Sequence, residues 1–303
     1  MISYKGLEAK LKERGITRSH LTKEPGISSR TIARIGRGEK LSRAVMEKLC
    51  AYFACEAGDL CRRVSDNPIL QTLRDEKEAG ISGGLYHELQ VRMTYNSNHI
   101  EGSRLTERQT RLIFETRTLD TSGGVPVDDI LETVHHFRAV DYVIDCAEDE
   151  LTEEIIRTLH GILLRDTKDA SLDWFAVGDY KRRPNVVGGL ETVKPKDVPA
   201  RMKALLDVYN ARPEVTIHDV IAFHAEFEKI HPFQDGNGRV GRLIALKECL
   251  RHGIVPFLIE DSKKAYYYRG LSEWDREKGW LTDTCLDGQD TFKKLLAMFA
   301  ADD

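Results

Sequence analysis

The sequence has no long hydrophobic run, since no apolar stretch approaches the roughly eighteen residues that a membrane-spanning helix needs. No signal peptide opens the chain, and it has neither internal repeats nor low-complexity segments. These absences argue against a membrane protein and a repeat architecture, so we expect a soluble, cytoplasmic protein without a membrane partner. The 303 residues, 41% of them hydrophobic, are enough to bury one large core and one small core.

Cysteine pairs with metal-binding or redox spacing are also missing. Six cysteines occur, and none of them belongs to a Cys-x-x-Cys pair. Cys50, Cys55 and Cys61 lie five and six residues apart, with no histidine nearby. We therefore expect reduced thiols rather than a zinc site or a disulfide framework.

Charge is distributed unevenly between the start of the chain and the rest. Residues 1–65 contain 14 Lys and Arg against 7 Asp and Glu, a net charge of +7. Residues 66–303 contain 31 against 42, a net charge of −11. A small basic module joined to an acidic one is typical of nucleic-acid contact by the basic part. We therefore expect two domains, 1–65 and 66–303, joined by a linker around Arg63–Pro68.

The first domain has apolar positions at helical spacing, interrupted by turns. Leu21–Arg34 indicates a helix, a glycine turn and a second helix capped by serine. This pattern resembles the Cro/repressor-type helix-turn-helix, which implies that the second helix contacts double-stranded DNA. The candidate groove-facing residues are Ser29, Arg30, Thr31 and Arg34. One such module binds weakly without a dimer partner, so a homodimer and a protein-binding role both stay open.

The most informative stretch is His231-Pro-Phe-Gln-Asp-Gly-Asn-Gly-Arg-Val-Gly-Arg242. Upstream, Thr216–Asp219 is a capping box, and an apolar helical face continues from it to Ile230. The glycine cluster ends this helix, and a second helix is expected to start near Gly238 and to stop before Gly253. The turn between them therefore lies at a helix N-terminus, where free N–H groups and the helix dipole favour an anion.

The side chains of this turn suit phosphate chemistry. Gly236 and Gly238 allow the backbone to approach an oxygen that a Cβ atom would block. Arg239 and Arg242 lie on one side of the first helical turn, and guanidinium groups match phosphate oxygens. Asp235 is an oxygen ligand of the kind that Mg²⁺ takes together with phosphates and water. The histidine that opens the stretch can be neutral and basic at physiological pH. Together, these glycines, arginines, carboxylate and histidine predict phosphoryl or nucleotidyl transfer.

The stretch matches H-x-F-x-[DE]-G-N-G-R-x-x-R, the signature of the Fic family, at every fixed position. The resemblance covers residues 66–290. Residues 128–138 resemble the family's helix leading into the core, residues 178–189 its flap, a hairpin that holds the target segment, and residues 265–271 a later helix bordering the nucleotide. The resemblance implies transfer of AMP from ATP to a hydroxyl group of a target protein. Since the glycines and the last arginine are all present, AMP transfer is favoured over phosphorylation.

The resemblance also implies a role for each residue of the motif. His231 is expected to deprotonate the target Ser, Thr or Tyr, and Asp235 to hold Mg²⁺ between the α- and β-phosphates. The expected ATP-binding residues are Phe233, which anchors the loop in the core, Gly236, Asn237 and Gly238, which form the anion hole, Arg239 at the β-phosphate, and Arg242 at the γ-phosphate.

A second motif, Ser97–Gly102, fits [ST]-x-x-x-E-[GN] and resembles the inhibitory helix of autoinhibited Fic proteins. An apolar face leads into it, so we expect a helix over about residues 85–102. The resemblance implies that Ser97 and Glu101 are inhibitory, because a carboxylate paired with Arg242 would occupy the place that the γ-phosphate needs. The alternative is an ordinary helix end with a glycine C-cap, and both interpretations can hold at once.

We expect a mainly α protein: a helical Fic domain with a short β-hairpin flap near residues 180–194, and a small N-terminal helix-turn-helix bundle. Ser122–Pro126 predicts a surface loop. The expected function is autoinhibited protein adenylylation with ATP and Mg²⁺. One alternative is removal of AMP from a modified protein, with Glu101 positioning a water. The other is transcriptional regulation by a Fic core that senses ATP without transferring AMP.

Overall fold

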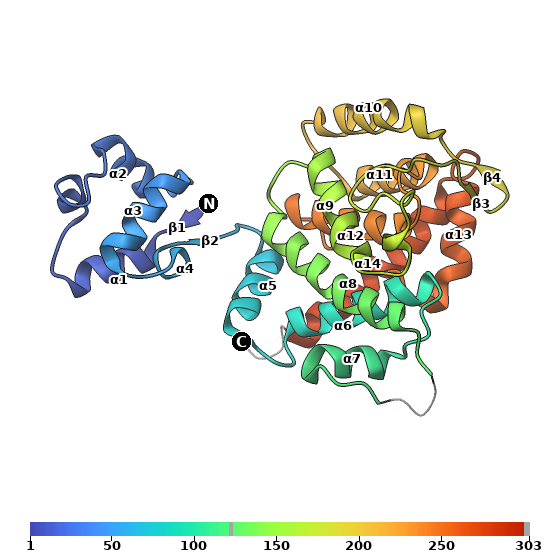
Figure 1. Ribbon diagram of the computed structural model, residues 1–303, viewed down its shortest axis with the longest axis horizontal. Helices are drawn as coiled ribbons and strands as arrows, with labels where there is room; N and C mark the ends of the chain where they lie inside the picture. The colour runs from blue at the N-terminus through green and yellow to red at the C-terminus, as the bar shows by residue number, and fades with distance from the viewer. Residues whose placement is uncertain (121–123, 300–303) are drawn as a thin grey trace. The chain divides into compact units, whose positions relative to one another are not determined.

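The computed structural model describes residues 1–120 and 124–299, and it divides into two compact units, Met1–Gln71 and Thr72–Asp303 (Figure 1). The protein is mainly α, as the sequence predicts, and the described part contains two short strand pairs. Of the predicted loop Ser122–Pro126, Ser122 and Gly123 lie outside the described residues. None of the described helices is long and apolar enough to cross a membrane.

The first unit is a small helical bundle closed by a pair of strands. Its elements are β1 (Ile2–Ser3), α1 (Lys5–Glu13), η1 (Arg18–Thr22), α2 (Ser29–Gly36), α3 (Arg43–Phe53), α4 (Ala57–Leu60) and β2 (Arg62–Arg63). Antiparallel pairing of β1 with β2 brings the start and the end of the unit together. The Ser28 hydroxyl accepts a hydrogen bond from the backbone N–H of Thr31 at 3.2 Å, which gives α2 the serine cap that the sequence predicts.

The second unit, together with the helix that leads into it, is built almost entirely of helices. Its elements are α5 (Pro68–Ala79), α6 (Leu85–Ile100), α7 (Glu107–Thr116), α8 (Val127–Cys146), α9 (Glu153–Leu164), η2 (Asp169–Ser171), β3 (Val186–Val187), β4 (Leu190–Glu191), η3 (Pro195–Asp197), α10 (Val198–Asn210), α11 (Ile217–Ile230), α12 (Asn237–Arg251), η4 (Asp261–Lys263), α13 (Lys264–Ser272) and α14 (Gly279–Phe299).

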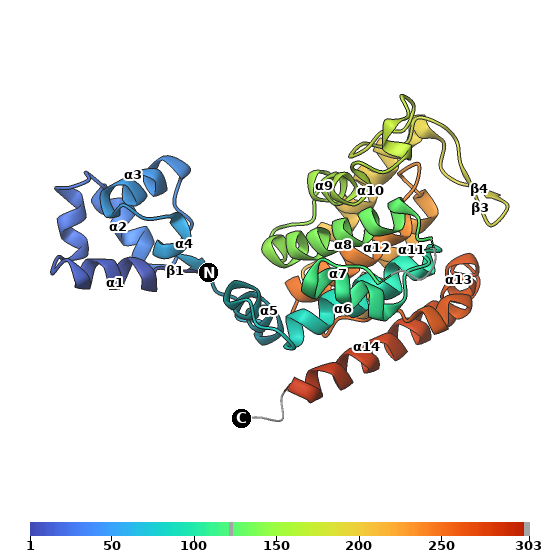
Figure 2. The same ribbon diagram turned by 60° about the horizontal axis from the view of Figure 1, so that its bottom comes forward.

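Helix α12 lies at the centre of this unit. It contacts α6, α8, α9 and α11, and Figures 1 and 2 show these helices around it. Nearly every residue of α12 is buried, including two arginines, a lysine and a glutamate. A helix that is buried on all sides keeps its polar groups only when partners satisfy them, so α12 carries both the core and the polar groups of the site.

Helices α11 and α12 follow the signals in the sequence. Asp219 Oδ2 accepts a hydrogen bond from the backbone N–H of Thr216 at 2.8 Å, and the Thr216 hydroxyl accepts one from Asp219 N at 3.4 Å. This reciprocal capping box starts α11, as predicted. Helix α12 begins at Asn237 and ends at Arg251, two residues before Gly253, which has a positive φ.

Candidate active site

The motif residues form the loop that joins α11 to α12. His231 is the C-cap of α11 and has a left-handed backbone conformation, with φ 51° and ψ 62°. Gly236 is the N-cap of α12 and has φ 75°. A Cβ atom at Gly236 would lie 2.7 Å from Leu164 Cδ2 on α9, so the position requires glycine for its conformation and for space. The non-glycine αL residue at His231 is a strained position of the kind that clusters at functional sites.

Two polar contacts and one ring contact hold the loop in shape. Asn237 Oδ1 accepts a hydrogen bond from the backbone N–H of Phe233 at 2.8 Å, and Asn237 Nδ2 donates to Phe233 O at 3.0 Å. The Phe233 ring is fully buried and stacks on His160 of α9, with ring centroids 4.0 Å apart. The side chains of Phe233 and Asn237 therefore shape the loop, and only their backbone groups can face a nucleotide.

The environment of His231 keeps its imidazole neutral. Burial is the main cause, the nearby Lys181 ammonium group adds to it, and together they lower the pKa of His231 to about 4. A hydrogen bond with the backbone of Glu228 and the carboxylates of Asp235 and Glu101 oppose this shift. A neutral imidazole can accept a proton at physiological pH, which is what a general base requires.

Arg242 is buried in α12 and is held by the end of α6. Its Nη2 lies 2.6 Å from Glu101 Oε1 and donates to Ser97 O at 2.9 Å, while its Nε donates to Ser97 Oγ at 3.0 Å. Glu101 is the C-cap of α6, so it lies at a helix end as the sequence predicts. The structure thus brings Ser97 and Glu101 together with the last arginine of the motif.

The Glu101 carboxylate also covers the N-terminus of α12. A Cβ atom added at Gly238 would overlap Glu101 Oε1 and would lie 3.0 Å from Arg242 Nη1. The carboxylate therefore occupies the anion position that the free N–H groups and the dipole of α12 create. A phosphate group cannot take the same position while Glu101 is there.

The other arginine of the motif has a partner that sequence reasoning missed. Arg239 is buried, with its Nη1 2.7 Å from Glu132 Oε2 of α8 and its Nη2 3.3 Å from Asp235 Oδ2. Burial raises the pKa of Glu132 and the Arg239 charge opposes that shift. Within residues 1–120 and 124–299, Arg239 Nε has no hydrogen-bond partner. An unsatisfied buried donor beside the α12 N-terminus fits a phosphate oxygen.

A second layer of titratable groups lies behind Arg242. Glu228 and His224 of α11 both approach Gly241, where a Cβ atom would overlap Glu228 Oε1. Burial raises the pKa of Glu228 to about 8, with Arg242 opposing and Glu101 adding to the shift. His224 Nε2 and the Tyr267 hydroxyl share a hydrogen bond of 2.8 Å. The buried acid is therefore mostly protonated near neutral pH, and Arg242 keeps Glu101 as its charged partner.

Asp235 is the candidate metal ligand of the loop. Its side chain is 56% exposed, and within the described residues it forms a long ion pair with Arg239. In the described part of the chain, no cluster of three or more His, Cys, Asp or Glu could hold a metal. One accessible carboxylate beside a phosphate site still fits Mg²⁺, which is commonly bound by one or two carboxylates, substrate phosphates and water.

The hairpin predicted near residues 180–194 is present, and its strands are short. β3 and β4 contain two residues each and pair antiparallel. Gly188 and Gly189 join them with φ of 56° and 83°, the values that a tight two-residue hairpin turn needs. Just beyond the strands, Thr192 N donates to Asn185 O at 3.3 Å, and the side chains of these two residues accept hydrogen bonds from Lys181 Nζ. Figures 1 and 2 both show the hairpin near α13.

The candidate DNA-contact residues lie on α2, three of them at its start and Arg34 in its last turn. Ser29 and Arg30 are exposed, and the Thr31 hydroxyl shares a hydrogen bond with the N-cap serine. Arg34 has a different environment, because its Nε donates to Glu39 Oε2 at 3.0 Å and its Nη2 donates to Lys40 O at 2.6 Å. Arg34 thus stabilises the loop after α2, whereas Arg30 is available at the surface.

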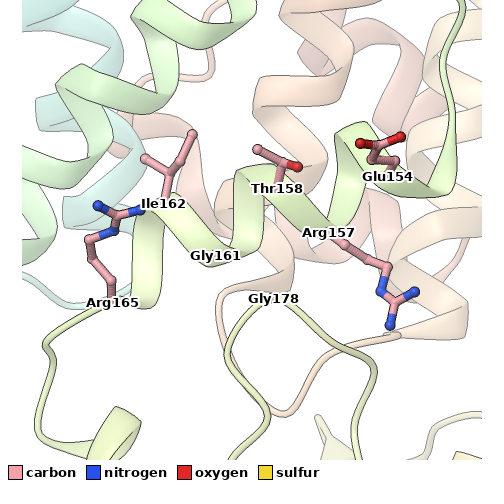
Figure 3. Close-up of a pocket in the computed structure, with 7 residues that line it drawn as sticks. All are labelled: Glu154, Arg157, Thr158, Gly161, Ile162, Arg165 and Gly178. Carbon is pink, nitrogen blue, oxygen red and sulfur yellow. The ribbon is translucent and has the colours of Figure 1, made fainter.

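A hollow of about 510 Å³ lies on the outer face of α9 (Figure 3). No residue of the motif lines it, and the side chains of Arg157 and Arg165 point in different directions there. Arg157 is paired with Asp179 and packs against the Tyr180 ring. This hollow is therefore separate from the candidate active site.

Two segments of the chain match models of known families. Residues 150–249 match the Fic/DOC family, and residues 7–66 match the Cro/C1-type helix-turn-helix DNA-binding domain. The first segment contains the whole loop from His231 to Arg242, and the second contains α2.

Curated relatives and solved structures agree with these matches. The chain is 31% identical over 182 residues to the protein adenylyltransferase Fic of Drosophila willistoni, covering 58% of this chain and 35% of that protein. It is 31% identical over 181 residues to the Drosophila melanogaster protein of the same name, covering 58% and 36%. The chain therefore spans just over a third of the length of these relatives.

The structural neighbours have the same fold as the second unit. A Fic domain containing signaling protein from Bacteroides thetaiotaomicron has a TM-score of 0.60 and 26% identity, covering 76% of this chain and 95% of that one. A Fic family protein from Desulfovibrio desulfuricans has a TM-score of 0.59 and 22% identity, covering 78% and 76%.

Proposed function

We propose that this chain, in which a Fic domain follows a Cro/C1-type helix-turn-helix domain, is a protein adenylyltransferase that its own Glu101 holds inactive. The observation that carries the proposal is the 2.6 Å pairing of Glu101 with Arg242 at the N-terminus of α12. The substrates are ATP and a Ser, Thr or Tyr hydroxyl group of a target protein.

The reaction needs a base, an anion site and a held leaving group. His231 takes the proton of the target hydroxyl, whose oxygen forms a bond to the α-phosphorus of ATP. The bond from that phosphorus to the α,β-bridging oxygen breaks, and pyrophosphate leaves. The α12 N-terminus with Gly236 and Gly238 binds phosphate oxygens, and Arg239 and Arg242 neutralise the β- and γ-phosphates.

Mg²⁺ would be held by Asp235 together with phosphates and water, and it would supply neutralisation of the phosphate charge. Arg239 keeps Asp235 near the site through the 3.3 Å contact between their side chains. Glu132 in turn fixes Arg239 from α8, so three side chains of alternating charge line this edge of the loop.

Inhibition follows from competition for one cation. Arg242 is buried and has Glu101 as its charged partner, so the γ-phosphate can reach it only by displacing that carboxylate. Without the Arg242 contact, the phosphates can still bind elsewhere in the loop in a geometry that is wrong for in-line attack. Glu101 therefore lowers the rate of transfer more than it lowers the affinity for ATP.

For the first unit we propose binding to duplex DNA through α2. The net charge of +7 over residues 1–65 and the exposed Arg30 at the start of α2 support this role.

The experiment that tests the enzymatic proposal uses the Glu101→Gly variant with Mg²⁺ and ATP labelled at the α-phosphate. We expect label on the variant itself and on proteins of a cell lysate, with AMP located on a hydroxyl side chain by mass spectrometry. The matched control is Glu101→Gly with His231→Ala, which keeps the phosphate site and lacks the base.

Two results would contradict transfer. If the variant adds no AMP to any protein but the wild-type chain removes AMP from a previously modified one, the activity is de-adenylylation, with Glu101 positioning water. If no transfer or removal occurs but ATP alters DNA binding by the full chain, the Fic core acts as a nucleotide sensor.

A further inference from the structure

Lys181 is a buried cation at the base of the hairpin. Its side chain is 3% exposed, and its Nζ donates to Asn185 Oδ1 at 2.8 Å, Thr192 Oγ1 at 2.6 Å and Ile230 O at 3.5 Å. All three partners are neutral, and no carboxylate pairs with this ammonium group in the described residues. Burial alone lowers the pKa of Lys181 to about 8. Burying an ammonium group without a counter-ion costs free energy, so these hydrogen bonds are needed to hold Lys181 in this position.

These hydrogen bonds connect the hairpin to the loop of His231. Asn185 and Thr192 flank the two strands, and Ile230 is the residue before the histidine. The backbone repeats the connection, since Lys181 N donates to Pro232 O at 2.9 Å. Asn185 Nδ2 donates to Phe233 O at 3.0 Å. The base of the hairpin is thus attached to the residues on both sides of His231.

The hairpin needs this attachment because it is too short to hold itself. Each strand has two residues, and Val186 on β3 is 60% exposed. Isolated two-stranded hairpins are marginal in water, and a larger sheet or packing against a helix is needed for stability. Its position relative to His231 is therefore set mainly by the Lys181 hydrogen bonds and the two backbone contacts.

Lys181 also acts on His231 through its charge. It is the second cause of the lowered pKa of His231, after burial. The opposing groups are the Glu228 backbone, Asp235 and Glu101. One residue therefore connects the hairpin and the candidate base in two independent ways, by hydrogen bonds and by electrostatics.

We propose that Lys181 is a positioning residue that fixes the target-holding hairpin against His231, so that the target hydroxyl meets the base at the α-phosphorus. This rests on the proposed transfer reaction, because it assigns the hairpin to the protein target. The proposal gives Lys181 no contact with ATP or the reacting atoms, so its removal should affect transfer and not nucleotide binding.

The first test needs no activity. Amide hydrogen exchange is measured over residues 185–192 in the wild-type chain, in Lys181→Met and in Lys196→Met, which removes the same group from an exposed site nearby. Lys181→Met should raise exchange about tenfold or more, the effect of losing charge-assisted hydrogen bonds, and Lys196→Met should leave it unchanged. Equal exchange in all three chains would overturn the proposal.

Thr192→Val keeps the test decisive if Lys181→Met does not fold. It removes one acceptor of Lys181 and retains the side-chain shape and the charge. Exchange in the hairpin should rise in Thr192→Val as well. A pH titration of the ¹⁵N-labelled histidines, with His231→Asn to assign the signal, separates the hydrogen bonds of Lys181 from its charge. The pKa of His231 should rise in Lys181→Met, which removes the charge, and should be unchanged in Thr192→Val, which keeps it. An unchanged pKa of His231 in Lys181→Met would contradict the effect of the Lys181 charge on His231.

The kinetic test uses the Glu101→Gly background, with self-transfer from labelled ATP as the readout. Adding Lys181→Met should lower transfer at least tenfold while the dissociation constant of ATP stays the same. A matching loss of ATP affinity would show a general disturbance of the loop and overturn the positioning role. If Glu101→Gly itself transfers no AMP, the proposed function fails, whereas hydrogen exchange still decides whether Lys181 holds the hairpin.

Discussion

His231 combines a strained backbone with an imidazole that stays neutral. Its left-handed conformation ends α11 and turns the chain into the loop, and burial with Lys181 holds its pKa near 4. A base with this pKa is fully deprotonated at physiological pH but has a modest driving force for proton transfer. The arrangement favours availability of the base over its strength.

We predict that His231→Ala lowers AMP transfer by about 10²–10⁴-fold and leaves ATP binding unchanged. Because only the neutral imidazole accepts a proton, the His231-dependent rate should be flat as pH falls from about 8 to about 6 and should decline only toward the lowered pKa of about 4. The measurement is self-transfer by Glu101→Gly across this range. A rate that halves near pH 6.5 would show an unperturbed histidine and contradict the electrostatic account.

The motif residues could be located from sequence because they are local. Gly236, Gly238 and Arg239 lie within four positions of each other, so the turn, the helix start and the charges are visible in one window. Glu132 and Lys181 could not be found that way. Their partners lie on elements far away in the chain, and a lone glutamate or lysine in a sequence usually indicates a solvated surface.

The N-terminus of α12 is the element that decides what the site can bind. Gly238 leaves room beside the first turn, and the Glu101 carboxylate fills it. The same room is where the free N–H groups of the helix can meet a phosphate. In the proposed function, the Glu101 carboxylate and the phosphate therefore both require glycine at position 238.

Gly238→Ala tests whether displacing the Glu101 carboxylate is enough for activation when the phosphate position itself stays blocked. The new Cβ atom would overlap Glu101 Oε1 and lie 3.0 Å from Arg242 Nη1, so the carboxylate must leave. We predict that this variant remains inactive and loses ATP affinity about tenfold or more, because the methyl group blocks the phosphate as well. The measurement is the rate of AMP transfer and the dissociation constant of ATP for Gly238→Ala, each compared with the value for Glu101→Gly. Activation of Gly238→Ala to the level of Glu101→Gly would contradict the shared-site account.

Helix α2 gives a second test at this scale. Arg30→Ala should weaken binding of the full chain to duplex DNA and lower the salt dependence by about one unit of log–log slope, because an exposed arginine neutralises phosphate. Arg34→Ala should instead lower the unfolding temperature of the first unit, since Arg34 holds Glu39. Arg43→Ala, an exposed arginine on α3, is the control for both. Equal loss of salt dependence in Arg30→Ala and Arg34→Ala, with stability unchanged, would show that both contact DNA.

Elements with caps and glycine stops were predictable, and the hairpin was predictable only in outline. The capping box of α11 and the glycine after α12 fix those helix limits locally. The strands β3 and β4 are shorter than residues 180–194 suggest. The side chains of Asn185 and Thr192 just beyond them bind Lys181, and no local sequence signal indicates this contact.

At the scale of the whole molecule, the proposed inhibition depends on a contact between residues 141 positions apart. α6 and α12 are packed in the same unit, so the end of α6 delivers Glu101 and Ser97 to Arg242 without any further domain. The motif of α6 predicted this pairing, whereas the buried Glu228 behind it was not foreseen. The loop of His231, the hairpin and the Glu101 carboxylate all belong to the second unit.

Comparison of four chains tests the central claim, namely wild type, Glu101→Gly, Arg242→Ala and the double variant, with self-transfer from labelled ATP as the readout. Coupling between a displaced carboxylate and phosphate binding is typically about 5–150-fold, so Glu101→Gly should exceed wild type by at least that order. Arg242→Ala should not be activated, because it loses the γ-phosphate contact along with the inhibitor's partner, and the double variant should match it. Equal transfer by wild type and Glu101→Gly, in a preparation that binds ATP, would contradict inhibition by Glu101.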